Sequence, residues 1–78
     1  MSEYTVAKVL DLKGLPCPMP VVKLSQEIGS VAVGEIIEVL TTDPGSLSDF
    51  PAWASTTGHQ VLGSEQGSPI KIFVKRCK

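Results

Sequence analysis

The residue with the clearest chemical potential is Cys17, within the segment Gly14-Leu15-Pro16-Cys17-Pro18-Met19-Pro20. A proline directly after Cys17 disfavours helical geometry at Cys17 and suits the first position of a helix, so Cys17 is predicted to be an N-cap residue. Because Pro20 has no N–H group, the amide of Met19 is the donor left for the sulfur. The positive end of the helix dipole also favours a thiolate. A reactive thiol is therefore favoured over the alternative, a buried structural cysteine.

Three other residues have weaker settings. Cys77, the second cysteine, lies near the chain end between two cations, on a tail predicted to be mobile; it is interpreted as incidental rather than as a resolving cysteine. His59 is the only histidine and has no neighbour with metal-ligand spacing, so no metal site is expected. Asp43 before Pro44-Gly45 is typical of a turn, with a functional carboxylate as the alternative.

Length and composition limit the possible classes of protein. The chain has 78 residues, of which 42% are hydrophobic and 19% charged, so residues 1–78 are expected to form one domain. A net charge of −1 does not indicate nucleic-acid binding. No apolar run is long enough for a membrane span, and the first residues do not resemble a secretory signal. We therefore expect a cytoplasmic protein with free thiols.

The first half of the chain predicts the elements around Cys17. Alternating apolar residues indicate a strand over Tyr4–Leu12, although Lys8 interrupts the pattern. A helix is predicted over Pro18–Ile28, with Gly29 as its stop. Glu35–Thr42 is apolar on both faces, which is typical of an interior strand.

The second half predicts another helix and a hairpin. A helix is expected over Ser46–Thr57 and ends at Gly58, and Pro51 predicts either a kink or a new start with Asp49 as N-cap. In the final strand, Phe73 alternates with the residues that face the core. The hairpin strands are His59–Glu65 and Ile70–Lys75.

The order of these elements, βαβαββ, defines a fold class. It predicts an α/β (α+β) two-layer sandwich, in which two helices pack on one face of a four-stranded mixed sheet. The order of the strands in the sheet does not follow from the sequence.

Several motifs together resemble the TusA (SirA-like) sulfur-carrier family over about residues 11–75. They are the Cys-Pro-x-Pro segment that begins at Cys17, Thr42-Asp43-Pro44-Gly45-Ser46, Pro51-Ala52-Trp53 and Thr57-Gly58-His59. The resemblance implies the same two-layer fold and a Cys17 that carries sulfane sulfur as a persulfide, without a cofactor or metal. It also implies a supporting motif of Gly14, Pro18, Met19 and Pro20, and a docking surface that includes Asp43 and Phe50.

The resemblance also implies the partners of the protein. Family members take sulfur from a cysteine desulfurase or a rhodanese-like donor and pass it to acceptor proteins for tRNA thiolation, molybdenum-cofactor assembly or sulfur oxidation. Several members have a second cysteine where this chain has Ala54, so a carrier with a single thiol fits better. We expect a monomer that forms transient complexes, without nucleic acid or membrane. The alternative is a non-catalytic redox or regulatory adaptor, in which Cys17 is a sensor or structural.

Overall fold

The structure is a computed structural model that describes residues 5–16 and 19–78. Its elements follow the expected βαβαββ order, with a short 3-10 turn after the first helix. The expected start of the first strand at Tyr4 and of the first helix at Pro18 lie outside the described residues. The elements are β1 (Val6–Asp11), α1 (Met19–Glu27), η1 (Ile28–Ser30), β2 (Ile36–Thr41), α2 (Ser46–Thr57), β3 (Gln60–Glu65) and β4 (Ile70–Lys75).

The four strands form one mixed sheet in the order β1-β2-β4-β3. β1 and β2 are parallel, and α1 lies on the crossover that connects them, as parallel neighbours require. β4 is antiparallel to both β2 and β3, which confirms the predicted hairpin. The interior place expected for the second strand is also confirmed, because β2 lies between β1 and β4.

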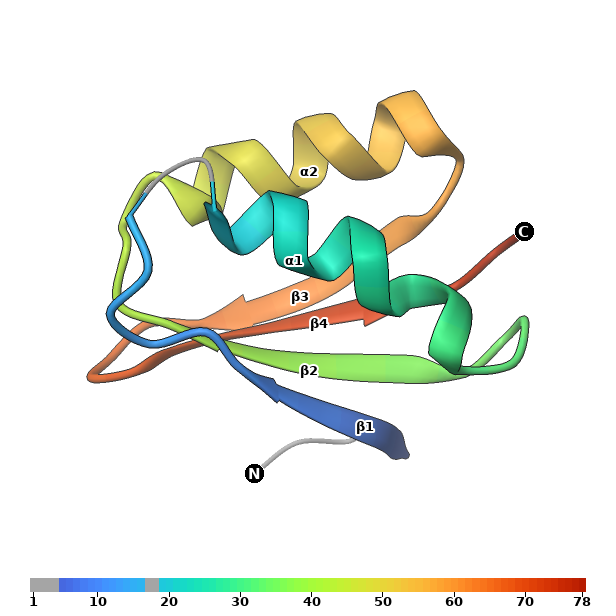
Figure 1. The fold of residues 1–78 in the computed structure, drawn as a ribbon, viewed down its shortest axis with the longest axis horizontal. Coiled ribbons are helices and arrows are strands. Elements are labelled where there is room, and N and C mark those ends of the chain that lie inside the picture. The colour runs from blue at the N-terminus through green and yellow to red at the C-terminus, as the bar shows by residue number, and fades with distance from the viewer. Residues whose placement is uncertain (1–4, 17–18) are drawn as a thin grey trace.

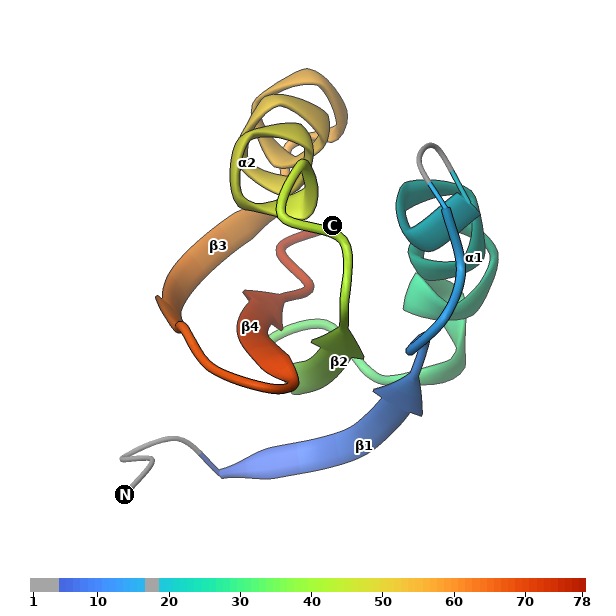
Figure 2. The same cartoon turned by 90° about the vertical axis from the view of Figure 1, so that its left-hand side faces the viewer.

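Both helices cover the same face of this sheet, which confirms the two-layer α+β sandwich (Figures 1 and 2). The apolar stripes of the helices meet the inward face of the central strands, where burial of apolar side chains stabilises the fold. Within the cluster between sheet and helices, the side chains that are at most 1% exposed are Leu24, Ile37, Val39, Phe50, Ile72 and Val74.

Figure 1 shows that the two ends of the molecule differ. The loops after β1 and β2 and the starts of both helices lie at one end, and the chain ends at the opposite end. The first turn of a helix has free N–H groups and a partial positive charge. Both helices therefore direct their positive ends toward the loops that follow β1 and β2.

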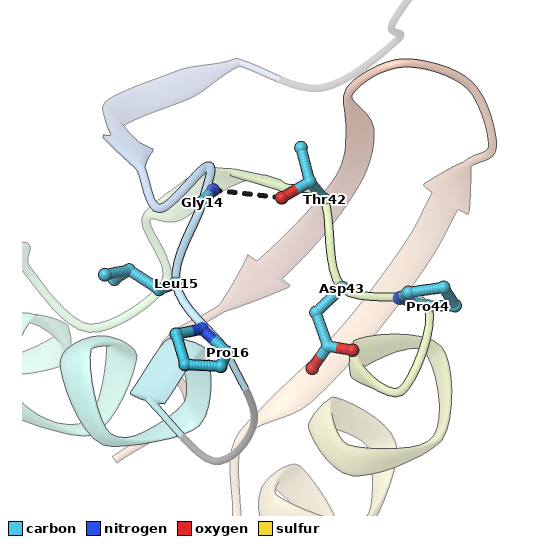
Figure 3. A pocket seen from close by; sticks show the side chains of 6 residues that line it. All are labelled: Gly14, Leu15, Pro16, Thr42, Asp43 and Pro44. Carbon is cyan, nitrogen blue, oxygen red and sulfur yellow. Dashed lines mark hydrogen bonds between the residues drawn. The ribbon is translucent and has the colours of Figure 1, made fainter.

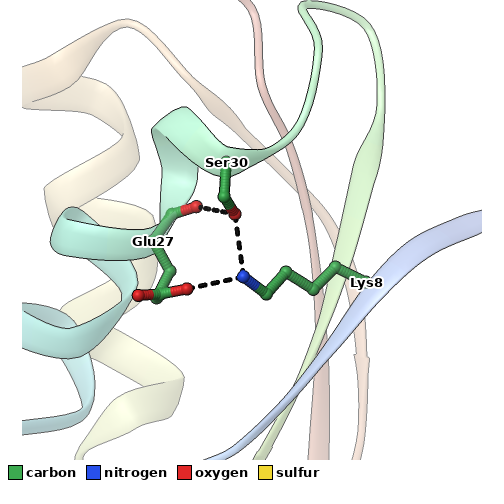
Figure 4. A network of polar contacts seen from close by, with 3 residues as sticks. All are labelled: Lys8, Glu27 and Ser30. Atoms are coloured by element: carbon green, nitrogen blue, oxygen red, sulfur yellow. Dashed lines mark hydrogen bonds and ion pairs between the residues drawn. The ribbon is translucent and has the colours of Figure 1, made fainter.

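The cation that interrupts the apolar pattern of β1 has a defined partner at the far end of α1 (Figure 4). Lys8 Nζ donates to Glu27 Oε1 at 2.5 Å and to Ser30 Oγ at 2.9 Å, and Ser30 Oγ donates to the Glu27 carbonyl oxygen at 2.6 Å. The ammonium group beside Glu27 lowers the pKa of that carboxyl below its ordinary value. The network ties the edge strand to the junction between α1 and η1.

The helix ends follow the predictions only in part. α2 ends at Gly58, whose φ of 85° is left-handed, as expected. Gly29 does not stop the first helix in a left-handed cap but lies within η1. The new start predicted at Asp49 is wrong: the amides of Ser48 and Asp49 both donate to the Gly45 carbonyl, so the helix has already begun, and Pro51 lies inside it.

Phe73 keeps the expected alternation, and yet only 1% of it is exposed. Its neighbours Ile72 and Val74 belong to the core between sheet and helices, whereas Phe73 alternates with them. Across the sheet it pairs with Glu38 on one side and Gly63 on the other.

Candidate functional site

A pocket lies between the loop that precedes α1 and the loop that precedes α2 (Figure 3). It has a volume of about 290 Å³, and its first wall ends at Pro16, the residue before Cys17. Gly14 shapes this wall: its φ of 82° is left-handed, and its amide donates to Thr42 Oγ1 at 2.9 Å. The lining residues are Gly14, Leu15, Pro16, Thr42, Asp43 and Pro44.

Asp43 forms the second wall of the pocket, and its turn is held by local hydrogen bonds. Its Oδ1 accepts the Gly45 amide at 3.1 Å, which is the bond of an Asx turn. Its Oδ2 is buried and has no hydrogen-bond partner among the described residues. Figure 3 shows the carboxylate on the side of the turn that faces Pro16. A buried acceptor without a donor is unfavourable, so the fold bears a cost at this oxygen.

Only some of the expected site residues are brought together by the structure at one end of the molecule. Gly14 and Asp43 line the same pocket, and the loops that carry them are joined through Thr42, which the sequence analysis did not single out. Met19 starts α1 and is 36% exposed, whereas Pro20 is fully buried. Cys17 and Pro18, the central predictions, lie outside the described residues.

The expected donor to the sulfur of Cys17 has another partner. The amide of Met19 donates to the carbonyl oxygen of Pro16 at 2.8 Å. This hydrogen bond gives a main-chain acceptor to the one donor that the sequence left for an N-cap side chain, because Pro20 has no N–H group. The predicted hydrogen bond from the Met19 amide to the sulfur of Cys17 lies outside the described residues, and the contact shown for this amide is the one with Pro16.

The docking role expected of Phe50 does not fit its position. Its side chain is 0% exposed and belongs to the core cluster, because it faces the sheet from α2. A partner that binds the surface cannot contact it without disrupting the core. Phe50 is therefore corrected from a docking residue to a packing residue.

The C-terminal tail is held in place, which corrects the prediction that it is mobile. Gly34 donates to the carbonyl oxygen of Arg76 at 2.6 Å, and the Arg76 amide donates to Glu35 at 3.0 Å. The Cys77 amide donates to Nδ1 of His59 at 3.1 Å. Cys77 is exposed, but this tail is at the end of the molecule opposite the start of α1 (Figure 1).

His59 has a structural setting at the same end. Its ring stacks on Trp53, with centroids 5.3 Å apart and planes at 25°. Partial burial lowers the pKa of His59, and the nearby charges of Arg76 and Lys78 lower it further. A neutral ring is the form that can accept the Cys77 amide at Nδ1. Stacking on Trp53 and this hydrogen bond thus hold the ring of His59 directly before β3.

Residues 5–16 and 19–78 contain no group of three or more histidine, cysteine or acidic side chains that could hold a metal ion. Within the same ranges, no helix combines the length and the hydropathy needed to cross a membrane.

Comparison with known proteins gives matches over nearly the whole chain. The model of the family "Sulfurtransferase TusA" matches residues 8–76. A candidate sulfur carrier protein of Halobacterium salinarum is 46% identical over 79 residues, covering 99% of this chain and 98% of that protein. The sulfur carrier protein TusA of Allochromatium vinosum is 35% identical, covering 86% and 90%. A SirA-like protein of Desulfitobacterium hafniense, at 19% identity, has the same fold with a TM-score of 0.75 over 91% of this chain and 99% of that structure.

Proposed function

Because this chain belongs to the TusA sulfurtransferase family, we propose that it is a sulfur carrier that accepts sulfane sulfur as a persulfide on Cys17 and hands it to an acceptor protein. The observation that carries the proposal is the family match over residues 8–76, which includes Cys17 and its Cys-Pro-x-Pro motif. The pocket supports it, because one wall ends at Pro16, directly before Cys17.

The proposed chemistry is two exchanges of one sulfur atom between thiols. The Cys17 thiolate attacks the terminal sulfur of a donor persulfide; a new S–S bond forms, the S–S bond of the donor breaks, and the donor leaves as a thiolate with the electron pair. An acceptor thiolate then attacks the terminal sulfur on Cys17 and releases the Cys17 thiolate. Neither exchange requires an external oxidant or reductant.

The fold supports this chemistry through electrostatics. The starts of α1 and α2 lie at the same end of the molecule, around the loops after β1 and β2 (Figure 1). Their partial positive charges favour anions, and both the thiolate and the persulfide form of Cys17 are anionic. The carrier therefore needs no cofactor or metal for the transfer.

We propose that the sulfur donor and the sulfur acceptor dock in turn on this end of the protein. Met19 offers an apolar contact that is 36% exposed, and Asp43 lines the pocket at the same end. The partners are a cysteine desulfurase or a rhodanese-like donor and a downstream acceptor thiol protein, in the cytoplasm, where thiols stay reduced. Release after each transfer requires small and transient interfaces.

Loading and discharge distinguish this carrier from a redox or regulatory adaptor. The protein is incubated with a cysteine desulfurase and cysteine, separated from both, weighed by intact mass spectrometry, and then mixed with an acceptor thiol. We expect one added sulfur atom that leaves on mixing. Cys17→Ser should gain none, and the matched control Cys77→Ser should behave as the unmodified sequence does. Absence of sulfur on the wild-type protein, or sulfur that does not leave, would contradict the proposal.

A further inference from the structure

A hydrogen bond from a side chain ties the loop after β1 to the end of β2 (Figure 3). The amide of Gly14 donates to Thr42 Oγ1 at 2.9 Å, across 28 positions of the chain. The amides of Lys13 and Leu15 donate instead to oxygen atoms two and three residues earlier in the same segment. Within the described part of the loop, residues 13–16, Gly14 is therefore the residue whose amide reaches another segment.

Thr42 is carried by a buried strand of the sheet. It directly follows β2, in which Ile37, Val39 and Thr41 are 0% exposed. Thr42 itself is exposed, so its side chain contributes little to the packing of the core. The contact that the structure gives to its hydroxyl is the bond to Gly14. This bond, and not burial, therefore indicates what the hydroxyl does.

Gly14 supplies the backbone conformation that the bond requires. Its φ of 82° lies in the left-handed region, where a residue with a side chain is strained. A Cβ added there would meet nothing within 4 Å, so the surrounding space would admit alanine. The glycine is thus required by the backbone conformation that directs its amide to Thr42, and not by close packing.

The bond bears on the position of Cys17, because both lie in one short loop. Leu15, next to Gly14, packs against the core, and Pro16 is the residue before Cys17. On the other side, the amide of Met19 donates to the carbonyl oxygen of Pro16 at 2.8 Å. The chain on both sides of Cys17 is therefore held at Pro16. The place of Pro16 is set in turn by the core contact of Leu15 and by the bond of Gly14.

We propose that Thr42 is a positioning residue for sulfur transfer: through the Gly14 amide, its hydroxyl holds in one place the loop that carries Cys17. The inference rests on the proposed function, in which the sulfur of Cys17 attacks a persulfide. Such an attack is fast only when the reacting sulfur atoms meet in a suitable orientation. The bond is at the surface, so water can solvate the amide when the bond is lost. Its loss therefore changes the order of the loop more than the stability of the fold.

The test is the second-order rate constant for loading Cys17 with sulfur from glutathione persulfide, a small donor that requires no docked protein. All proteins carry Cys77→Ser, so the gain in mass reports on Cys17. Thr42→Val keeps the shape of the side chain and removes the acceptor, so we expect the rate constant to fall about fivefold, the effect of one lost hydrogen bond. Thr42→Ser keeps the hydroxyl and should restore the rate. Thr57→Val is the matched control and should not change it, because Thr57 is also exposed and its hydroxyl donates to the carbonyl oxygen of Trp53 at 2.8 Å.

Two glycines provide a second test that leaves Thr42 in place. Gly14→Ala and Gly34→Ala both put a Cβ on a left-handed residue, at φ values of 82° and 93°, with nothing within 4 Å. The strain is therefore similar, and urea unfolding should show similar losses of stability. Only Gly14→Ala should slow loading, because Gly34 bonds to the C-terminal tail at the opposite end of the molecule. If Thr42 acts through Gly14, Thr42→Val should add no further decrease in the Gly14→Ala background.

Three results would overturn the inference. They are unchanged loading in Thr42→Val, loading of Thr42→Ser as slow as that of Thr42→Val, and a full additional decrease in the Gly14→Ala background. Should Thr42→Val fail to fold by circular dichroism, the comparison of Gly14→Ala with Gly34→Ala decides. Equal loading rates of these two variants would then overturn the inference.

Hydrogen exchange separates this inference from the proposed function. Thr42→Val should speed exchange of the Met19 amide about fivefold, because the loop is less well held, and leave the amides of β3 unchanged. Equal exchange at Met19 with and without the substitution would overturn the inference. Failure of the proposed function has a different signature: no protein, the parent included, would gain sulfur on Cys17, while exchange at Met19 would still respond to Thr42→Val.

Discussion

Replacing Phe50 with alanine distinguishes a core residue from a docking residue. Phe50 is 0% exposed and packs in the core cluster, so truncation removes buried apolar area and leaves a cavity. Phenylalanine-to-alanine changes at such positions cost about 3–5 kcal/mol. At roughly 0.05–0.15 kcal/mol per residue, a chain of 78 residues has a free energy of unfolding of about 4–12 kcal/mol. Phe50→Ala should therefore lose a quarter or more of the stability.

Urea unfolding followed by the fluorescence of Trp53, the single tryptophan, measures this loss. Phe50→Leu keeps most of the apolar volume and should cost less than about 1.5 kcal/mol, so it provides a folded variant for transfer assays. Ser55→Ala, at an exposed position of the same helix, is the control and should change stability by less than about 0.5 kcal/mol. A Phe50→Ala protein as stable as this control, but weaker in binding a cysteine desulfurase, would refute the packing role.

Three further predictions concern stability away from the pocket. Gly58→Ala should lower the free energy of unfolding by about 1–2 kcal/mol, visible in thermal melting, because alanine is strained at a φ of 85°. Since the pKa of His59 is lowered on folding, the unfolded chain binds the proton more readily, and the free energy of unfolding should fall as the pH drops below about 6.5. Urea unfolding at several pH values should show that His59→Gln removes this pH dependence. Hydrogen exchange should show weaker protection of the Cys77 amide in the same variant. The lowered pKa of Glu27 acts in the same direction, so stability is lost as the pH falls from 4.5 through the pKa of the folded state. Lys8→Met should make the difference between the free energies of unfolding at pH 7 and pH 3 smaller, as urea unfolding at both pH values would show.

The fold was predictable where local chemistry determines it. The bounds of α2 agree with the sequence because Pro44-Gly45 precedes the helix and Gly58 can adopt the left-handed cap. The order of the strands was not predictable, because it depends on which distant segments pair. The anchored tail was missed for a related reason: Arg76 is held through backbone groups of Gly34 and Glu35, which leave no pattern in the side chains.

The candidate site was likewise predictable only where its contacts are between residues close in the sequence. The Asx turn of Asp43 is local, and the residues Asp43-Pro44-Gly45 indicated it. The bond from Gly14 to Thr42 joins segments 28 residues apart, so the sequence alone could not place their loops side by side. Phe50 was assigned to the surface from a resemblance, whereas the structure buries it in the core cluster.

The central claim is that the sulfur atom of Cys17 carries the transferred sulfur. Locating the added sulfur in the wild-type protein tests this claim most directly. The protein is loaded by a cysteine desulfurase with cysteine, the thiols and persulfides are alkylated, and proteolytic peptides are sequenced by mass spectrometry. Both cysteines are present, so they compete under equal conditions. We predict that the extra sulfur is on the peptide that contains Cys17 and that it disappears when an acceptor thiol protein is added. Extra sulfur on Cys77, or none on either peptide, would contradict the claim.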